Sequence, residues 1–245
     1  MRICISGAPN TGKQNFVEDF SKEWDMYSVY RADKSKPGFT KEELLTELNA
    51  CIDNLQQYKR EDNIIFDNSP IDYLVYSFWA ADKGIKGFDK ELLNSIVPLV
   101  RESMRFVDIV FFTPISLASP IEEEKEDVIR EELDNIYKAI VANYHTNLEA
   151  DMFFPKDDCP SVIDIFGTRE QRILLVKNYI STNGDVFGSE EDSILNPENL
   201  QDMENILKSQ LKANEEEQRE LRTEAMKKVV TAYSKKLKLP SNLLR

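Results

Sequence analysis

The residues best suited to do chemistry lie in the segment from Gly7 to Gln14, GAPNTGKQ, between a short apolar run and a helical pattern. Two glycines five positions apart let the backbone curl so that successive N–H groups point inward, toward phosphate oxygens. Lys13 follows the second glycine directly, and its ammonium can reach the outer phosphates. The alternative is a glycine-rich turn that arose by chance. We predict phosphate binding by seven residues of this loop: Gly7, Ala8, Asn10, Thr11, Gly12, Lys13 and Gln14.

Gln14 departs from the usual form of such a loop, because a Ser or Thr hydroxyl that binds Mg²⁺ normally follows the lysine. The Gln14 amide oxygen can contact a cation or one of its waters, but through a longer arm. Asp67 is the second metal candidate because it follows the apolar run IIF and would lie beside the loop. Its carboxylate would hold Mg²⁺ through water or accept a proton from an attacking hydroxyl. The alternative is a strand-end carboxylate that caps the next turn.

The elements that must position these residues alternate between strands and helices. Short apolar runs predict five strands, at 2–6, 27–30, 63–66, 107–113 and 161–166. Helical spacing of apolar residues predicts helices at about 16–24, 41–55, 71–81, 89–104, 121–148 and 168–180. This alternation favours an α/β fold with a parallel sheet covered by helices on both faces, a three-layer sandwich. Ligands bind such sheets at the carboxyl ends of the strands, where Gly7, Asp67 and Thr113 would lie.

The chain changes character after about residue 183, so we predict an α/β domain at 1–183 and a helical C-terminal extension at 184–245. The extension begins like a loop, and its apolar residues then recur at helical spacing. Acidic residues dominate its first half and basic residues its second half. Such a tail would fold back as a hairpin, pair with a second copy of the chain or bind an acidic protein partner. A solvated helix with an ordinary charge bias is the alternative.

Composition and net charge limit the classes of protein to which the chain can belong. The 245 residues contain 44 Asp and Glu against 31 Lys and Arg, a formal net charge of −13, which disfavours non-specific binding to nucleic acid or anionic membranes. Three widely spaced cysteines and one histidine form no zinc-binding pattern. Because residues 1–6 are typical of a short strand, we expect no leader, and the sequence contains no apolar stretch of about 20 residues. We therefore expect a protein of a reducing compartment, the cytoplasm, without a membrane span.

Four motifs of the sequence resemble those of the P-loop nucleoside and nucleotide kinases: ISGAPNTGK, YSVYR, IIFDNSPIDYLVYSFW and VDIVFFTPI. The chain is most similar to the bacterial and phage AAA-type group that includes the ribosylnicotinamide-kinase-like proteins, and the likeness covers about residues 1–180. This resemblance implies an ATP- and Mg²⁺-dependent transfer of the γ-phosphate to a nucleoside, a nucleotide or a related hydroxyl acceptor. It also implies that Lys13 and Asp67 act in catalysis, with Gln14 and Asp67 as the metal ligands.

The same resemblance implies roles for residues outside the loop. A lid at about 114–135 would bring Arg130 to the transferring phosphate, whereas spacing alone equally allows Arg130 an intrahelical ion pair with Asp127 or Asp134. The third strand of these kinases normally ends in Asp-Arg, but Asn68 replaces the arginine here. Asp72 stands at a helix start, where acids are common for dipole reasons alone. Residues implied at the acceptor are Arg31, Asn68 and Asp72, and those implied near the adenine are Gly167 and Arg169.

Two functions of different classes stay open on the sequence. The first is the kinase, with a variant whose acceptor is 5-hydroxymethyluracil in DNA, as in the resembling phage DNA kinases. The second is a nucleotide-binding interaction protein whose catalysis has decayed. Gln14, Asn68 and the acidic lid favour the second function, in which the C-terminal extension would bind a partner protein or a second copy.

Overall fold

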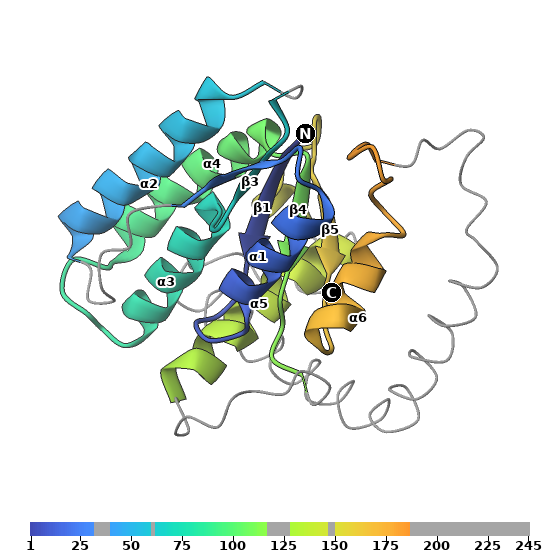
Figure 1. The fold of residues 1–245 in the computed structure, drawn as a ribbon. Helices are drawn as coiled ribbons and strands as arrows, with labels where there is room; N and C mark the ends of the chain where they lie inside the picture. The colour runs from blue at the N-terminus through green and yellow to red at the C-terminus, as the bar shows by residue number, and fades with distance from the viewer. Residues whose placement is uncertain (32–39, 60–61, 117–127, 147–149, 187–245) are drawn as a thin grey trace.

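Five parallel strands form the central sheet. The computed structural model describes residues 1–31, 40–59, 62–116, 128–146 and 150–186. The strands pair in the order β2-β3-β1-β4-β5, so that β1 lies in the middle (Figure 1). The strand bounds are Arg2–Ser6 for β1, Ser28–Tyr30 for β2, Ile64–Phe66 for β3, Ile109–Phe112 for β4 and Ser161–Asp164 for β5. The predicted five-stranded parallel sheet is confirmed.

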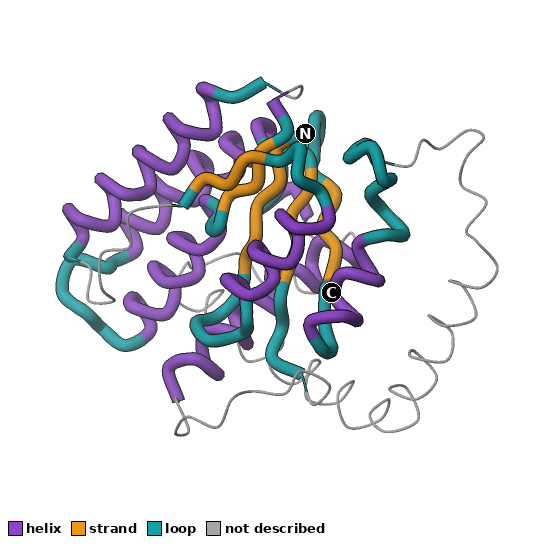
Figure 2. Tube along the Cα trace, viewed as in Figure 1, coloured by secondary structure: helices purple, strands orange, loops and turns teal. Residues whose placement is uncertain are grey.

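Helices cover both faces of this sheet. The helices α1 and α6 pack on one face, and α2, α3, α4 and α5 cover the other (Figures 1 and 2). The helix bounds are Lys13–Glu23 for α1, Lys41–Gln57 for α2, Pro70–Asp82 for α3, Lys90–Ser103 for α4, Val128–Thr146 for α5 and Arg169–Val176 for α6. Short 3₁₀ turns follow α4 and precede β5, at Met104–Phe106 (η2) and Ala150–Met152 (η3). The predicted three-layer arrangement is therefore confirmed.

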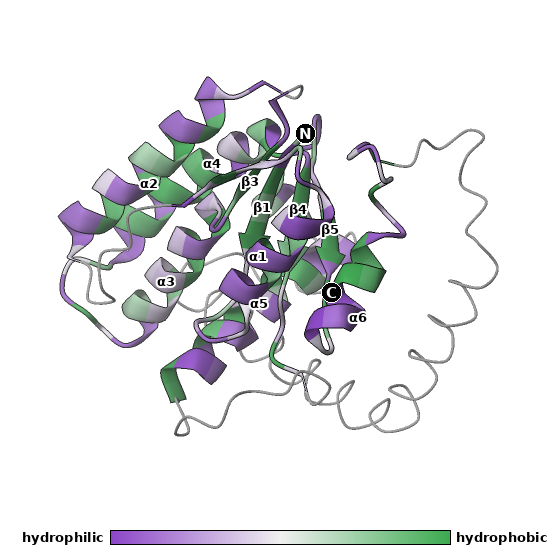
Figure 3. Ribbon diagram, in the orientation of Figure 1, coloured by the Kyte–Doolittle hydropathy of each residue, from purple (hydrophilic) through white to green (hydrophobic). Residues whose placement is uncertain are grey.

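Each strand divides its side chains between the two faces because neighbouring residues of a strand point in opposite directions. Cys4 and Phe112 belong to the core under α2 to α5. Ile3, Ile5 and Phe111 belong to the core under α1 and α6. Figure 3 shows the resulting pattern, with apolar strands in the middle and polar residues on the outer sides of the helices.

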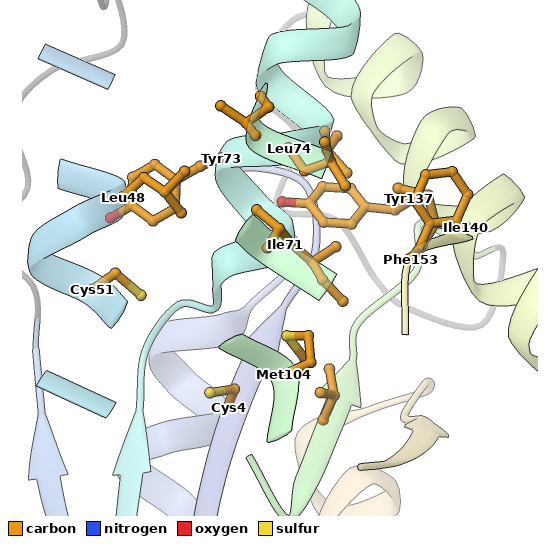
Figure 4. Packing of buried hydrophobic residues seen from close by; sticks show 14 of the residues in the cluster. Cys4, Leu48, Cys51, Ile71, Tyr73, Leu74, Met104, Tyr137, Ile140 and Phe153 are labelled. Carbon is orange, nitrogen blue, oxygen red and sulfur yellow. The ribbon is translucent and has the colours of Figure 1, made fainter. Parts of the chain in front are cut away.

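The larger core surrounds α3, which lies between α2 and α5 and also contacts α4 (Figure 4). Most of α3 is buried, including Ile71, Tyr73 and Leu74. Leu48 and Cys51 approach it from α2, while Tyr137, Ile140 and Phe153 approach it from the opposite side. Because α3 begins directly after β3, this packing holds the polar residues of its first turn inside the protein, next to the carboxyl edge of the sheet.

Aromatic rings fill the smaller core. The Phe20 ring centroid lies 4.7 Å from that of Trp24 and 5.2 Å from that of Tyr27. Phe16 meets Phe111 of β4 edge to face at 5.7 Å. Trp24 is buried, and its indole N–H donates a hydrogen bond to the Ser181 carbonyl. These rings fix α1 against the sheet, and α1 is the helix that carries the lysine of the glycine loop.

The element bounds differ from the predicted ones where loops meet helices. Helix α1 begins at Lys13 rather than at about residue 16, so its first turn belongs to the glycine loop. Helix α6 ends at Val176, and the chain continues as a turn closed by an isolated bridge between Ile180 and Val186. Of the predicted lid at about 114–135, residues 117–127 lie outside the described residues and residues 128–135 belong to α5. The extension beyond residue 186 also lies outside the described residues, so the acidic lid and the helical tail stay predictions. Within the described parts, none of the helices has the length and apolarity that a bilayer crossing requires.

Candidate functional site

The glycine loop runs from the end of β1 to the start of α1, at the carboxyl edge of the sheet. Asn10 and Gly12 have left-handed backbones, with φ of 58° and 81°, and Gly7 has a φ of 149°. A Cβ on Gly7 would lie 2.3 Å from Thr113 Oγ1 and 2.6 Å from the Thr113 carbonyl oxygen. Only glycine therefore permits this approach of the loop to the end of β4.

The N-terminus of α1 has no side-chain cap. Gly12 provides no side-chain cap, and the first turn of α1 contains no acidic residue. By contrast, the side chains of four capping residues accept hydrogen bonds at the starts of α2, α3, α4 and α6: Thr40, Ser69, Asp89 and Thr168. The first N–H groups of a helix need partners, and an anion can supply them. Lys13 is the first residue of α1, and its ammonium donates a hydrogen bond to the Gly7 carbonyl across the loop.

Hydroxyl groups under the loop tie it to the neighbouring strands. Thr11 Oγ1 donates to the Ala8 carbonyl at 2.9 Å and lies 2.8 Å from Thr113 Oγ1. Thr113 Oγ1 lies 3.1 Å from the Ser6 carbonyl oxygen, and the hydroxyls of Ser6 and Ser69 are 2.6 Å apart. The Thr11 side chain is buried, so this predicted loop residue faces the protein and leaves only its backbone for a phosphate.

Asp67 lies at the same edge as the loop. The pairing of β3 with β1 matches Phe66 to Cys4, which brings the following Asp67 close to the place where the loop leaves β1. Its backbone N–H donates to the Tyr30 carbonyl at 3.2 Å, and the residue is 4 % exposed. The structure thus places the loop and Asp67 at the ends of two adjacent strands, as the sequence predicted.

Asp72 connects α3 to α5 beneath the loop. One carboxylate oxygen accepts from the Ser69 N–H at 2.8 Å, in a capping box, and the other accepts from the Tyr137 hydroxyl at 2.5 Å. Burial raises the pKa of Asp72 above its ordinary value, while the Lys13 ammonium and the Tyr137 hydroxyl act in the opposite direction. Asp72 therefore has the helix-capping role that its position allowed, and the charge of Lys13 also affects its pKa. A role toward the acceptor stays a prediction.

The raised pKa of Asp72 predicts a pH-dependent contribution to stability. A carboxyl whose pKa is higher in the folded than in the unfolded chain stabilises the fold while protonated, so this stabilisation is present below about pH 4 and is lost as the pH rises through the folded pKa. Asp72→Asn removes the carboxyl. We expect the variant to gain stability relative to the wild type when the pH is raised from about 4 to about 7, as urea unfolding at both values would measure.

Tyr137→Phe is the companion variant, because loss of its hydroxyl removes a hydrogen bond that lowers the pKa of Asp72. We expect a loss of about 1 kcal/mol. The loss should be larger near neutral pH than near pH 4, the opposite trend to that of Asp72→Asn. Stability differences that do not change with pH in either variant would contradict this account of the buried carboxyl.

Asn68 and Arg31, two residues predicted to face an acceptor, occupy different surroundings. The Asn68 amide donates to the Tyr73 hydroxyl at 2.9 Å, so it bonds within the larger core at the start of α3. Arg31 is exposed directly after β2 and borders residues 32–39, which include Lys34 and Lys36 and lie outside the described residues. The structure therefore keeps both residues at the carboxyl edge, with Arg31 exposed and Asn68 partly buried.

Arg130 belongs to a charged face of α5. It is 7 % exposed. Burial raises the pKa of Asp134, one turn along the helix, while Lys138 and, more weakly, Arg130 act in the opposite direction. Asp134 pairs with Lys138 at 2.6 Å and accepts from the Ile115 N–H at 2.9 Å, while Lys138 donates to the Ile115 carbonyl at 2.8 Å. This face of α5 thus holds an ion pair between Asp134 and Lys138, and the ion pair of Arg130 that the spacing allowed stays a prediction. The Asp134–Lys138 pair also anchors α5 to the chain leaving β4; an approach of Arg130 to a phosphate stays a prediction.

The β5–α6 loop carries the two residues predicted near an adenine. Gly167 is buried with a φ of 89°, and a Cβ there would lie 2.3 Å from the Gln171 amide oxygen. Arg169 forms two hydrogen bonds, of 2.6 and 2.7 Å, to the Asp19 carboxylate of α1, and hydrogen bonding to this guanidinium lowers the pKa of Asp19. The structure thus directs Arg169 toward α1.

Arg172 is a residue that the sequence reasoning missed. It lies one turn after Thr168 on α6, is 6 % exposed, and donates from Nη1 to the Thr11 carbonyl at 2.7 Å. A signal for it exists in the sequence: Arg172, Leu175 and Val176 share one helical face, and both apolar residues are buried.

The metal candidates supply few ligands from the protein itself. Gln14 is exposed in the first turn of α1, and Asp67 lies at the end of β3. Among the residues that the structure describes, no three His, Cys, Asp or Glu side chains gather as a metal site. This donor set fits Mg²⁺ as it is held beside phosphates, with one carboxylate from the protein and most oxygens from phosphate and water.

Comparison with known proteins identifies the fold. No family model matches the sequence, and no curated protein matches it significantly. The deoxyadenosine kinase of M. mycoides, in a structure with bound dCMP and dCDP, is similar with a TM-score of 0.51 at 16% identity, over 73% of this chain and 97% of that chain. The thymidylate kinase of Candida albicans is similar with a TM-score of 0.52 at 18% identity, over 74% and 91%. At these identities the likeness shows the fold alone, which this chain shares with the two kinases.

Proposed function

We propose that the protein is an ATP-dependent phosphotransferase that moves the γ-phosphate of ATP to a hydroxyl or phosphate oxygen of a nucleoside, a nucleotide or a related small molecule. The observation that carries the proposal is the start of α1, where an uncapped helix terminus, a glycine loop and Lys13 converge. Main-chain N–H groups and one ammonium form a cradle for phosphate oxygens. Asp67, on the adjacent strand end, adds the carboxylate that phosphoryl transfer requires nearby.

In this function, Lys13 and the loop from Gly7 to Gln14 hold the β- and γ-phosphates. An oxygen of the acceptor attacks the γ-phosphorus, the bond to the bridging oxygen breaks, and ADP leaves; Asp67 takes the proton of an attacking hydroxyl. Mg²⁺, when bound, neutralises charge on the phosphates, and Asp67 and Gln14 are the residues that would hold it or its waters. Arg130 would approach from the lid.

The remaining assignments are parts of the same proposal. Residues 1–183 form the nucleotide-binding domain, and residues 184–245 form an extension that binds a protein partner or a second copy of the chain. The free thiols of Cys4, Cys51 and Cys159 suit a reducing cytoplasm. The β5–α6 loop lies toward the base, and the acceptor lies along the edge formed by three residues: Arg31, Asn68 and Asp72.

A second candidate is a nucleotide-binding interaction protein without transfer activity. Two observations favour it. Gln14 stands where a metal-binding hydroxyl is usual, and Asn68 stands where a guanidinium is usual and is engaged by Tyr73 instead. Both substitutions weaken charge neutralisation at the phosphates while leaving the cradle itself intact.

One experiment separates these functions. Purified protein is incubated with Mg²⁺ and γ-labelled ATP, together with ribonucleosides, deoxynucleosides or nucleoside monophosphates, or with DNA that contains 5-hydroxymethyluracil. Labelled small-molecule product supports the kinase, and label in the DNA alone supports the phage-type variant. ATP that stabilises the protein against heat without any transfer supports the interaction protein. Absence of both binding and transfer contradicts the proposed function.

A further inference from the structure

Arg172 joins the two loops that border the proposed nucleotide site. It projects from α6 and is 6 % exposed. Its Nη1 donates to the Thr11 carbonyl in the glycine loop at 2.7 Å, and its Nε donates to the Gly167 carbonyl in the β5–α6 loop at 3.2 Å. One planar guanidinium thereby sets the spacing between a loop that follows β1 and a loop that follows β5, on two strands that are not neighbours.

The contact with Thr11 also fixes the orientation of a peptide unit in the glycine loop. A trans peptide is planar, and its C=O and N–H point in opposite directions. Because Arg172 binds the Thr11 carbonyl, the Gly12 N–H of the same peptide unit points away from Arg172. Gly12 is the N-cap of α1, so this N–H belongs to the set of donors at the uncapped helix terminus.

The fit between Arg172 and the loop depends on glycine. A Cβ on Gly12 would lie 2.9 Å from Arg172 Nη1, and Gly12 already has a φ of 81°. The second glycine of the motif thus serves two purposes, a left-handed backbone and room for a guanidinium behind the loop. A guanidinium stays charged inside proteins, so the loop carries a fixed positive charge behind it as well as the Lys13 ammonium.

We propose that Arg172 is a positioning residue of the nucleotide site, which holds the glycine loop and the β5–α6 loop in one fixed arrangement and keeps the Gly12 N–H directed at a bound polyphosphate. This inference rests on the proposed function. Under this proposal, loss of Arg172 lowers the affinity for ATP more than it slows the transfer step.

Arg172→Met tests the proposal, with ATP binding measured by calorimetry. We expect the Kd for ATP to rise about 10- to 100-fold, because two carbonyls lose a charged donor and the loop peptide is no longer held. Arg172→Lys keeps the charge but reaches both carbonyls less well, so its Kd should lie between those of wild type and Arg172→Met. If the protein turns over, KM for ATP should rise by a larger factor than kcat falls.

Two variants of the same helix serve as controls. Lys177→Met removes a cation at the C-terminal end of α6, which pairs with Glu23 at 2.6 Å at the surface, and should leave the Kd for ATP within about twofold. Leu175→Ala removes a buried side chain of α6, so it lowers stability without touching either loop carbonyl. It should lower the melting temperature and leave ATP affinity close to that of wild type.

The outcomes distinguish this inference from the proposed function. Wild-type protein that binds no ATP contradicts both. Wild-type protein that binds ATP, with Arg172→Met binding it equally well, overturns the inference alone. A rise in Kd for Leu175→Ala as large as that for Arg172→Met also overturns it, because loss of stability would then account for the effect. If Arg172→Met does not fold, an unchanged Kd in Arg172→Lys overturns it.

Discussion

Replacing Lys13 with methionine is expected to lower kcat/KM for phosphate transfer by about 10²–10³-fold. The Lys13 ammonium donates a hydrogen bond to the Gly7 carbonyl across the glycine loop. Lys13 is also the first residue of α1, the helix whose N-terminus lacks a side-chain cap. Methionine keeps most of the length of the side chain and removes only its charge. ATP affinity should fall together with the rate, since the same charge neutralises the bound phosphates before and during transfer.

The matched control for this variant is Lys22→Met. Lys22 lies on the same helix, in its last turn, where its ammonium pairs with Asp19 at 3.5 Å at the exposed surface. We expect activity within about twofold of wild type, because exposed ion pairs contribute little. Calorimetric titration with ATP and a rate measurement with labelled ATP report the two effects. Unchanged ATP affinity in Lys13→Met would show that the glycine loop is not the phosphate site.

Asp67→Asn is expected to lower kcat by about 10²–10⁴-fold while ATP affinity changes much less. The carboxylate stands at the end of β3, 4 % exposed, beside the strand that carries the loop. Asparagine has nearly the same shape, so the backbone hydrogen bond from residue 67 to the Tyr30 carbonyl can remain. A loss of rate with retained binding would separate this residue from Lys13, whose removal affects both.

Asp89→Asn provides the control for the carboxylate. Asp89 caps α4, where its side chain accepts from the Leu92 N–H at 2.9 Å, and asparagine caps a helix equally well. Its activity should equal that of wild type. Should Asp67→Asn transfer phosphate at the wild-type rate, the proton would have to go elsewhere, and the role given to Asp67 would be wrong.

Much of the fold could be predicted because it depends on short-range patterns. Apolar runs of four to seven residues marked the strands, and strand–helix alternation required a parallel sheet covered on both faces. The two glycines and the lysine of the segment from Gly7 to Gln14 were enough to predict a phosphate-binding loop. Asp67 followed from the rule that ligands bind at carboxyl ends of strands, and the pairing of β3 with β1 brought it to the predicted edge.

The connections between these elements could not be predicted, because they join residues distant in sequence. The hydrogen bond from Tyr137 to Asp72 spans 65 positions, and that from Arg172 to Thr11 spans 161. Arg169 was predicted to lie at the nucleotide because it directly follows the strand–helix turn. Arg172, three residues later, is the arginine that faces the glycine loop. Residues three positions apart lie on the same side of a helix, so spacing does not distinguish the two arginines, and only packing determines which one meets the glycine loop.

The central position of β1 has a consequence for how the protein unfolds under denaturing conditions. All five residues of β1 are buried, β3 and β4 flank it, and Gly7 is fitted against Thr113 at its end. Segments embedded in this way open only when the whole domain opens, whereas exposed strand edges and loops that pack on no neighbouring strand fray earlier. The phosphate cradle should therefore persist up to the cooperative transition, and a denatured fraction measured by spectroscopy should equal the fraction that has lost nucleotide binding.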